Sequence, residues 1–174
     1  GGSCLPKDVS ALVGLATGLG TTAQMLGTLN ESNDNQISSI CERLLAEKPE
    51  SIGFLGISFK QGTDDLRGSP FVRIARCLID KGVKVSIYDK DVDLERFTGA
   101  NLTFLNSLIP ELNEITFSHA SEVIDNCEIV LLAHRNALHD LKLTPPKPNV
   151  KIFDLVGLSN DELSGFGDVE GLYW

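Results

Sequence analysis

The sequence lacks the marks of secreted, membrane-spanning and zinc-binding proteins. It has 4 cysteines, at positions 4, 41, 77 and 127, with no CxxC pair and no Cys/His spacing suited to zinc. Such few and scattered cysteines indicate a reducing compartment, so we expect a cytoplasmic protein without a metal site. No apolar run is long enough to cross a bilayer, and the first residues do not resemble a signal peptide.

Positive charge is also scarce, because 15 lysines and arginines face 24 acidic residues, for a net charge of -9. This balance excludes a broad nucleic-acid-binding surface. An anionic ligand must therefore be bound by a few local cations and by backbone N–H groups. Hydrophobic residues make up 42% of the 174 residues, which is enough for one domain with a substantial core and a helical appendage.

The first part of the chain has the spacing of helices. Apolar residues recur at helical intervals over 6–47, with an interruption by Gly-Leu-Gly at 18–20. Thr21 or Thr22 is the predicted cap of a second helix. The polar stretch 30–36 leaves the apolar positions in phase, so we predict one long helix with a polar middle.

From residue 49 onward, apolar segments with strand character alternate with helical ones. This alternation predicts an α/β fold, in which a long helical segment over 1–48 is followed over 49–174 by a Rossmann-like domain with a mostly parallel sheet in three layers. Ligands of such sheets lie beyond the carboxyl ends of the strands, so the loop at 57–69 is the first place to look for a site. The predicted strands are 51–56, 84–88, 114–117, 128–133 and 150–154, and the predicted helices are 69–82, 91–98, 104–110, 119–126 and 135–141.

The segment GGSCLPKD places Cys4 directly before a predicted helix. Backbone N–H groups and the helix dipole favour a thiolate there, and Lys7 adds a positive charge. A thiolate in this place is able to attack an aldehyde or acyl carbon. Gly1 and Gly2 let the backbone approach a ligand closely. The alternative interpretation is a buried cysteine that packs as a small hydrophobic residue.

The loop after the first predicted strand carries Lys60 and Arg67, two cations in an acidic protein. Ser69, followed by proline, has the pattern of a helix cap, which would leave free N–H donors at the helix N-terminus. Together these groups are suited to a pyrophosphate. The alternative is a solvated turn in which Arg67 pairs with Asp64 or Asp65.

Several further positions receive no function from the sequence alone. Gly53 and Gly56 lack the GxGxxG spacing of a dinucleotide site. Asp89 stands where Rossmann folds often bind a ribose, but a turn role is favoured. The three other cysteines, at 41, 77 and 127, are predicted to pack, and the histidines at 119, 134 and 139 are predicted to be surface or helix-end residues.

Two segments of the sequence, GGSCLPKD and GFLGISFKQGTDDLRGSP, resemble the signature segments of the UDP-glucose/GDP-mannose dehydrogenase family. The resemblance extends over essentially the whole chain and implies NAD-dependent oxidation of a sugar C6 alcohol to a carboxylate, with two NAD+ reduced per turnover. It further implies that Cys4 traps the aldehyde as a thiohemiacetal, which hydride transfer turns into a thioester that water hydrolyses.

The resemblance also assigns roles to single residues. Cys4 is the nucleophile, and Asp8 activates or positions water beside it. The long helix forms much of a homodimer interface. The remaining positions match binding residues of the family: Lys7 and Arg67 for NAD, and Gly1, Gly2 and Lys60 for the nucleotide sugar.

Within the family, the chain resembles the GDP-mannose 6-dehydrogenase branch, which makes GDP-mannose the favoured nucleotide sugar. The alternatives are a UDP-glucose-type 6-dehydrogenase and a non-catalytic module for nucleotide-sugar binding or dimerisation. The features that carry this resemblance are Leu5 and the segments SNDNQ at 32–36, DLVG at 154–157 and EGLYW at 170–174.

Two departures from the family pattern matter for the site. Gly68 follows Arg67 where the family usually has Glu, so a carboxylate that would hold Arg67 is missing. The chain begins with Gly rather than Met and shows no NAD-binding fingerprint, so we expect a carboxy-terminal portion without the NAD-binding domain. We expect this portion to be inactive by itself.

Overall fold

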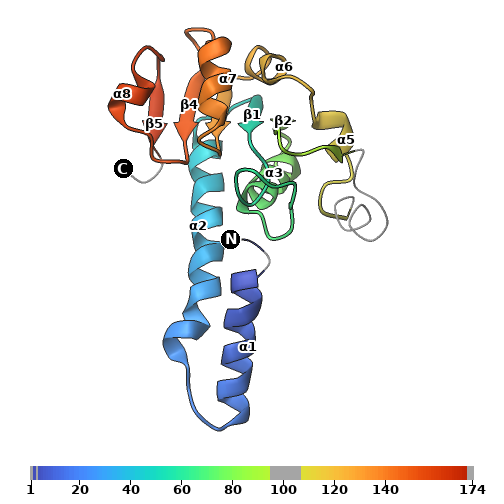
Figure 1. Ribbon diagram of the computed structural model, residues 1–174, viewed down its shortest axis with the longest axis vertical. Helices are drawn as coiled ribbons and strands as arrows, with labels where there is room; N and C mark the ends of the chain where they lie inside the picture. The colour runs from blue at the N-terminus through green and yellow to red at the C-terminus, as the bar shows by residue number, and fades with distance from the viewer. Residues whose placement is uncertain (1, 3, 95–106, 172–174) are drawn as a thin grey trace.

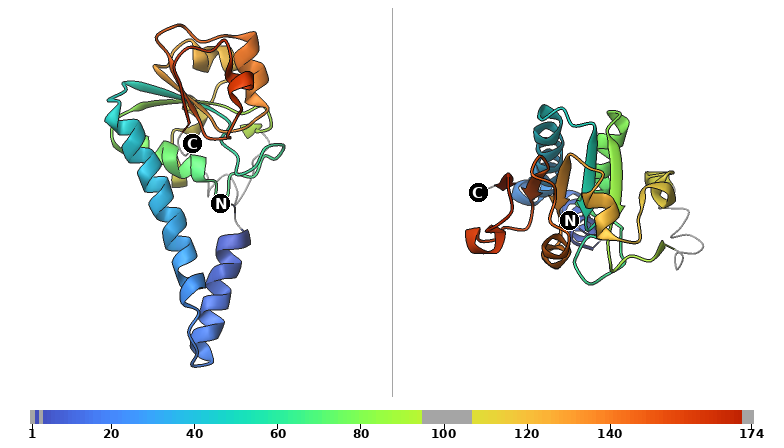
Figure 2. Two further views of the ribbon diagram at one scale, coloured as in Figure 1. Left: turned by 90° about the vertical axis from the view of Figure 1, so that its left-hand side faces the viewer. Right: turned by 90° about the horizontal axis from the view of Figure 1, so that it is seen from above.

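A helical hairpin projects from an α/β unit (Figures 1 and 2). The computed structural model describes residues 2, 4–94 and 107–171. The hairpin consists of α1 (Cys4–Gly18) and α2 (Gln24–Ala46), which run antiparallel. The long helix with a polar middle is confirmed, because α2 is continuous across the polar stretch. No helix in the described part of the chain is long and apolar enough to cross a membrane.

The helix starts differ from the prediction by a few residues. Cys4 is the first residue of α1 rather than the residue before it, and Asp8 lies beyond the first turn. The N-cap of α2 is Ala23, without a side-chain cap, so the predicted caps Thr21 and Thr22 are wrong. These threonines belong to the connection between the two helices, before the N-cap position of α2.

The polar middle of α2 is explained by its contacts with two other helices. The side-chain amide of Asn30 donates to the Ser10 hydroxyl of α1 at 3.0 Å and to the Pro6 carbonyl at 3.4 Å. Asp34 forms an ion pair with Arg73 of α3 (Pro70–Asp80) at 2.6 Å. The polar residues therefore fix α1 and α3 against α2, instead of interrupting the helix.

The sheet has five parallel strands in the order β2-β1-β3-β4-β5. Four of the five predicted strands are confirmed, with small shifts at their ends. The predicted α/β class, with a long helical segment before a parallel sheet, is thereby confirmed. The strands are β1 (Ser51–Leu55), β2 (Lys84–Tyr88), β3 (Ile129–Leu132), β4 (Lys151–Asp154) and β5 (Val169–Gly171).

Helices cover both faces of this sheet, as the views in Figure 2 show. The carboxy-terminal half of α2 and α3 share one buried cluster, which includes Leu44, Leu78 and Phe54. On the other face, α6 and α7 form a second buried cluster around Val123 and Leu138. The sheet therefore buries apolar side chains on both sides, as a three-layer domain must. The short helices are α5 (Leu112–Ile115), α6 (Ala120–Ile124), α7 (Ala137–Leu143) and α8 (Asn160–Leu163).

The predicted strand at 114–117 is wrong for most of its length, because α5 occupies its first half. Only Thr116 forms a parallel bridge, with Ile87 on the free edge of β2. Counted as a one-residue third strand, this bridge gives the sheet order 3-2-1-4-5-6 of a Rossmann fold. The sequence did not predict β5 or α8, and the predicted helices at 91–98 and 104–110 lie partly outside the described residues.

Candidate functional site

The amino-terminal segment packs against the loop that follows β1. The Gly2 amide donates to the Gly68 carbonyl at 2.8 Å. Gly2 is buried, with φ +87°, and a Cβ added to it would lie 2.9 Å from the Phe59 ring. Glycine is therefore required for this close approach. The contact joins the two signature segments in space, whereas Gly1 lies outside the described residues.

Cys4 and Arg67 lie at this junction. Cys4 is exposed in the first turn of α1. Arg67 forms a bidentate pair with Asp65, with its Nε 2.9 Å and its Nη2 3.0 Å from the two carboxylate oxygens. This pairing raises the pKa of Arg67, and the negative charge of a Cys4 thiolate adds a smaller increase. Arg67 in turn lowers the pKa of Asp65. A thiolate at Cys4 thus lies within electrostatic range of a guanidinium that Asp65 holds in place.

Gly68 has a structural consequence where the family pattern has Glu. Its φ is +65°, a conformation that strains residues with a side chain. Its carbonyl accepts the Gly2 hydrogen bond, and Asp65, two residues before Arg67, supplies the carboxylate partner of Arg67. In this chain, the carboxylate that pairs with Arg67 comes from within the loop.

The other predicted site residues are at the surface. Lys7 and Asp8 are exposed on α1, and Lys60 is exposed on the loop. Lys7 and Asp8 follow Cys4 by three and four residues, so the three side chains project from one face of the helix. The roles of Lys7, Asp8 and Lys60 in binding or catalysis stay predictions.

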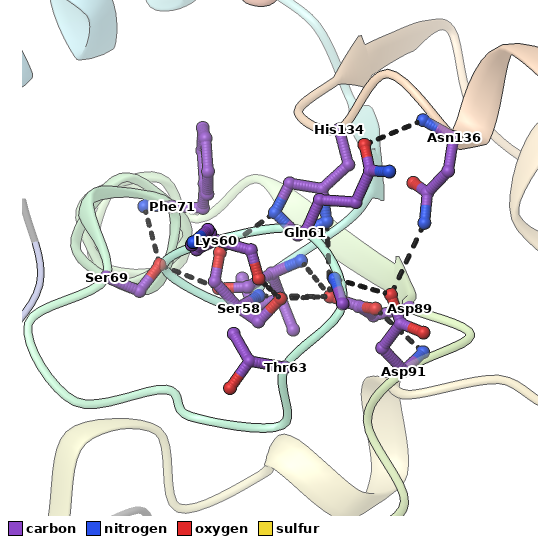
Figure 3. Close-up of polar contacts among 12 residues, drawn as sticks. Ser58, Lys60, Gln61, Thr63, Ser69, Phe71, Asp89, Asp91, His134 and Asn136 are labelled. Carbon is purple, nitrogen blue, oxygen red and sulfur yellow. Dashed lines mark hydrogen bonds and ion pairs between the residues drawn. The ribbon is translucent and has the colours of Figure 1, made fainter.

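Asp89, at the end of β2, holds the base of the loop (Figure 3). Its Oδ2 accepts hydrogen bonds from the amides of Ile57 at 2.8 Å and Ser58 at 3.0 Å, and from the Ser58 hydroxyl at 3.0 Å. Its Oδ1 accepts from the Asp91 amide at 3.0 Å, which forms the expected turn. The carboxylate is buried and engaged on both oxygens, so a structural role is favoured over contact with a ribose.

His134 is buried beside this carboxylate, so the prediction of a surface or helix-end residue is wrong. Its Nε2 lies 3.0 Å from the Ser58 carbonyl oxygen, and its Nδ1 lies 3.7 Å from Asp89 Oδ2. The ring meets Phe71 edge-on, with ring centroids 5.7 Å apart. His134 follows β3 by two residues, and because β3 and Ala133 are buried, the chain enters His134 from the interior.

The tip of the loop is tied to the ends of β2 and β3. Asp91 accepts from the Gly62 amide at 2.9 Å and from the Asn136 side chain at 3.3 Å. The main-chain amide of Asn136 donates to the Gln61 side-chain oxygen at 3.1 Å. Sequence reasoning did not single out Asp91 or Asn136. The signal that was available is their position just after β2 and β3, the two strands that flank β1 in the parallel sheet.

Ser69 is the N-cap of α3, as predicted. Its hydroxyl donates to the Ile57 carbonyl at 2.7 Å and accepts from the amides of Phe71 at 3.2 Å and Val72 at 3.5 Å. These two N–H groups are therefore engaged by the cap and are not free donors for a pyrophosphate. The cations Lys60 and Arg67 remain the exposed positive groups of the loop.

A separate open cleft of about 590 Å³ lies at the carboxyl end of β2. Its lining includes Tyr88, Lys90 and Phe117, but not Cys4 or Arg67. This cleft therefore does not coincide with the predicted site around Cys4 and Arg67. The candidate site is defined instead by its charges and contacts. Among the described residues, no group of His, Cys, Asp and Glu is arranged to hold a metal ion.

Comparison with known proteins decides the family. Residues 53–155 match the family model described as "UDP-glucose/GDP-mannose dehydrogenase family, UDP binding domain". The chain belongs to this family. The resemblance to this family is thereby confirmed.

The individual relatives are consistent with this assignment. The chain is 38% identical over 174 residues to the GDP-mannose 6-dehydrogenase of Pseudomonas putida, covering 100% of this chain and 40% of the relative. It superposes on a crystal structure of a ternary complex of GDP-mannose dehydrogenase from Pseudomonas aeruginosa with a TM-score of 0.82 at 35% identity, covering 100% of this chain and 39% of that one.

A UDP-glucose dehydrogenase from the hyperthermophilic archaeon Pyrobaculum islandicum shares the fold, with a TM-score of 0.74 at 21% identity over 100% of this chain and 38% of that one. The chain thus spans about two fifths of the length of the curated relative that it matches.

Proposed function

We propose that this chain supplies the nucleophilic thiol and part of the nucleotide-sugar site of an NAD-dependent nucleotide-sugar 6-dehydrogenase that converts GDP-mannose to GDP-mannuronate. The observation that carries the proposal is the hydrogen bond from Gly2 to Gly68, because it brings Cys4 to the loop of Lys60 and Arg67. Relatives named GDP-mannose 6-dehydrogenase match the whole chain, which favours GDP-mannose as the substrate.

The proposed chemistry centres on Cys4. Its thiolate adds to the C6 aldehyde carbon to form a thiohemiacetal, and loss of hydride from that carbon leaves a thioester. Water then attacks the thioester carbonyl, which releases the carboxylate and regenerates the thiol. In this proposal Asp8, on the same helical face, accepts the proton of this water.

When bound, NAD+ would accept the hydride in each of the two oxidations, from the C6 alcohol to the aldehyde and from the thiohemiacetal to the thioester. The residues present fit part of such a cofactor, because Arg67 and Lys7 offer positive charge to a pyrophosphate or a similar anionic group beside Cys4. In this arrangement Arg67, held by Asp65, would offer its charge to the anionic part of the cofactor. We place the reaction in the cytoplasm, where a reducing environment keeps the thiol available.

Two alternatives remain within the proposal. A UDP-glucose-type 6-dehydrogenase would use the same thiol with a different nucleotide. A non-catalytic module that binds nucleotide sugars or dimerises would have no need of an exposed cysteine in the first turn of α1, so this exposure favours the enzyme.

We further propose a homodimer formed through the helical hairpin. No residue of α1 is buried, although its composition is apolar. Leu15 is 60% exposed, Leu19 is 73% exposed, and Met25 at the start of α2 is 78% exposed. Side chains of this kind on neighbouring helices favour burial against a second copy.

Calorimetric titration of the chain with GDP-mannose, UDP-glucose and GDP tests the substrate site. We expect GDP-mannose to bind more tightly than UDP-glucose, and Lys60→Ala to weaken GDP-mannose binding about tenfold through loss of a charged contact. Lys142→Ala, on α7, is the control and should bind like the wild type. Equal binding by the Lys60→Ala and wild-type chains would remove Lys60 from the site.

A further inference from the structure

We propose that His134 is a positioning residue, which fixes the Ser58 carbonyl and thereby the segment of the loop that presents Lys60. The inference rests on the proposed function only in giving Lys60 a ligand. What it claims is that His134 holds the loop in one conformation, and this can be measured without any ligand.

The first argument is that the hydrogen bond to Ser58 has one possible direction. A carbonyl oxygen only accepts, so the Nε2 atom of His134 must carry the proton at 3.0 Å from the Ser58 oxygen. Ser58 is 0% exposed and His134 is 5% exposed. Without the histidine donor, this buried carbonyl would lose its side-chain hydrogen bond, which costs folding free energy.

The second argument is that the ring has little freedom to move. Gly56, with φ +105°, leaves room for it, since a Cβ there would lie 2.6 Å from Nδ1 of His134. Phe71 meets the ring edge-on, with planes 82° apart. A ring fixed on two sides can transmit its position to the one polar group that it contacts at hydrogen-bonding distance, the Ser58 carbonyl.

The third argument is the connection from Ser58 to the candidate site. The Ser58 hydroxyl lies 3.2 Å from the Lys60 carbonyl oxygen, and the Phe59 amide donates to the Asp65 carbonyl at 3.1 Å. The Phe59 ring is also the group that Gly2 approaches. A rotation of the peptide plane after Ser58 would therefore displace Phe59 and Lys60, and with Phe59 the ring against which Gly2 packs.

Three variants separate positioning from simple packing. His134→Leu keeps an apolar group of moderate size but removes the donor, whereas His134→Gln keeps an amide donor near the position of Nε2. His139→Leu makes the same chemical change at an exposed position of α7 and serves as the control.

Amide hydrogen exchange in the chain without ligand is the primary measurement. We expect His134→Leu to raise exchange at Ser58 and Phe59, whose amides are hydrogen-bonded, about tenfold, with the amides of β1 within about twofold of wild type. His134→Gln should restore most of the protection, and His139→Leu should change nothing. Unchanged exchange in the loop of His134→Leu would overturn the inference, and so would an equal rise in β1 or a failure of His134→Gln to restore protection.

Titration with GDP-mannose then separates this inference from the proposed function. If the wild-type chain binds and His134→Leu binds about tenfold more weakly, with the loop exchange as expected, both stand. If the loop exchange is as expected but the wild-type chain binds no nucleotide sugar, the positioning role stands and the proposed function fails. If His134→Leu binds as tightly as the wild type and its loop exchange is unchanged, the positioning role fails and the proposed function stands.

Discussion

The amide of Gly2 and the carbonyl of Gly68 form a 2.8 Å hydrogen bond between the start of the chain and the loop after β1. Both residues have positive φ, and the Gly2 backbone lies directly against the Phe59 ring. The segment just before α1, the helix that carries Cys4, is therefore held against the loop that carries Lys60 and Arg67. The proposed reaction depends on this contact between Gly2 and Gly68.

Gly2→Ala should disrupt the contact of Gly2 with Gly68 and Phe59. A Cβ at 2.9 Å from Phe59, on a residue with φ +87°, is expected to cost about 1–3 kcal/mol of unfolding free energy and to weaken GDP-mannose binding. Gly14→Ala in α1 is the matched control, because its Cβ would meet nothing within 4 Å, and we expect it to stabilise by about 0.5–1 kcal/mol. Urea unfolding measures both, and an equal effect of the two substitutions would contradict the packing of Gly2.

Alkylation should distinguish the cysteines. Burial raises the pKa of Cys41 to about 12, where contact with Cys77 also contributes, and burial raises the pKa of Cys127 to about 11. Both thiols are therefore protonated and shielded at pH 8, whereas Cys4 is exposed. We expect iodoacetamide to modify Cys4 first and to leave Cys41 and Cys127 intact in the folded chain, as read by peptide mass spectrometry. Rapid modification of Cys127 would contradict its burial.

Stability should fall in acid through a cluster that joins α2, β4 and β5. Lys151 lies 2.8 Å from Glu170 and 3.2 Å from Glu47, and Arg43 contacts both carboxylates. Hydrogen bonds from Lys151 and Arg43 lower the pKa of Glu170, and those from Arg43 and Lys151 lower that of Glu47. Because the folded state favours the ionised carboxylates, their contribution is complete above the ordinary value of 4.5 and is lost as pH falls through the lowered pKa.

Glu170→Gln tests this dependence. The variant should lose stability at pH 7 and show a smaller further loss between pH 5 and pH 3 than the wild type, as measured by thermal unfolding. Glu31→Gln, at an exposed position of α2, should leave the acid dependence unchanged. An acid dependence that is identical in Glu170→Gln and wild type would show that the cluster does not contribute.

The oligomeric state should depend on the apolar side chains of the hairpin. Leu15→Glu places a charge among them and should convert a dimer to a monomer in sedimentation velocity, since charges are excluded from the centre of such interfaces. Leu143→Glu, at a site that is 69% exposed on α7, makes the same change away from the hairpin and should leave the dimer intact. A wild-type chain that is monomeric at high concentration would contradict the proposed interface.

The sequence predicted the elements whose pattern is local. β2 has the predicted bounds, and α3 begins at the predicted serine cap. The segment at 114–117 has β-branched and aromatic residues and was predicted as a strand, yet tertiary packing gives it a helix followed by one bridge. The three-residue β5 is too short to carry an apolar pattern, so no local signal identified it.

The candidate site was predictable only in part, for a related reason. Motif residues such as Cys4 and Arg67 were found because each stands in a recognisable segment, and the structure brings those segments together. His134 was missed because its burial and its contact with Ser58 depend on residues far apart in the sequence. Asn136 and Asp91 likewise acquire a partner only when β2 and β3 lie in one sheet.

The role of Cys4 is tested most directly in an active enzyme in which this chain replaces the matched two fifths of the Pseudomonas putida relative. GDP-mannose and NAD+ are supplied, and acid formation is followed with Cys4 intact and with Cys4→Ser. A serine oxygen cannot form the thioester, so the account predicts a loss of acid formation of at least about a thousandfold, with GDP-mannose binding retained. Acid formation at an unchanged rate in Cys4→Ser would contradict the account.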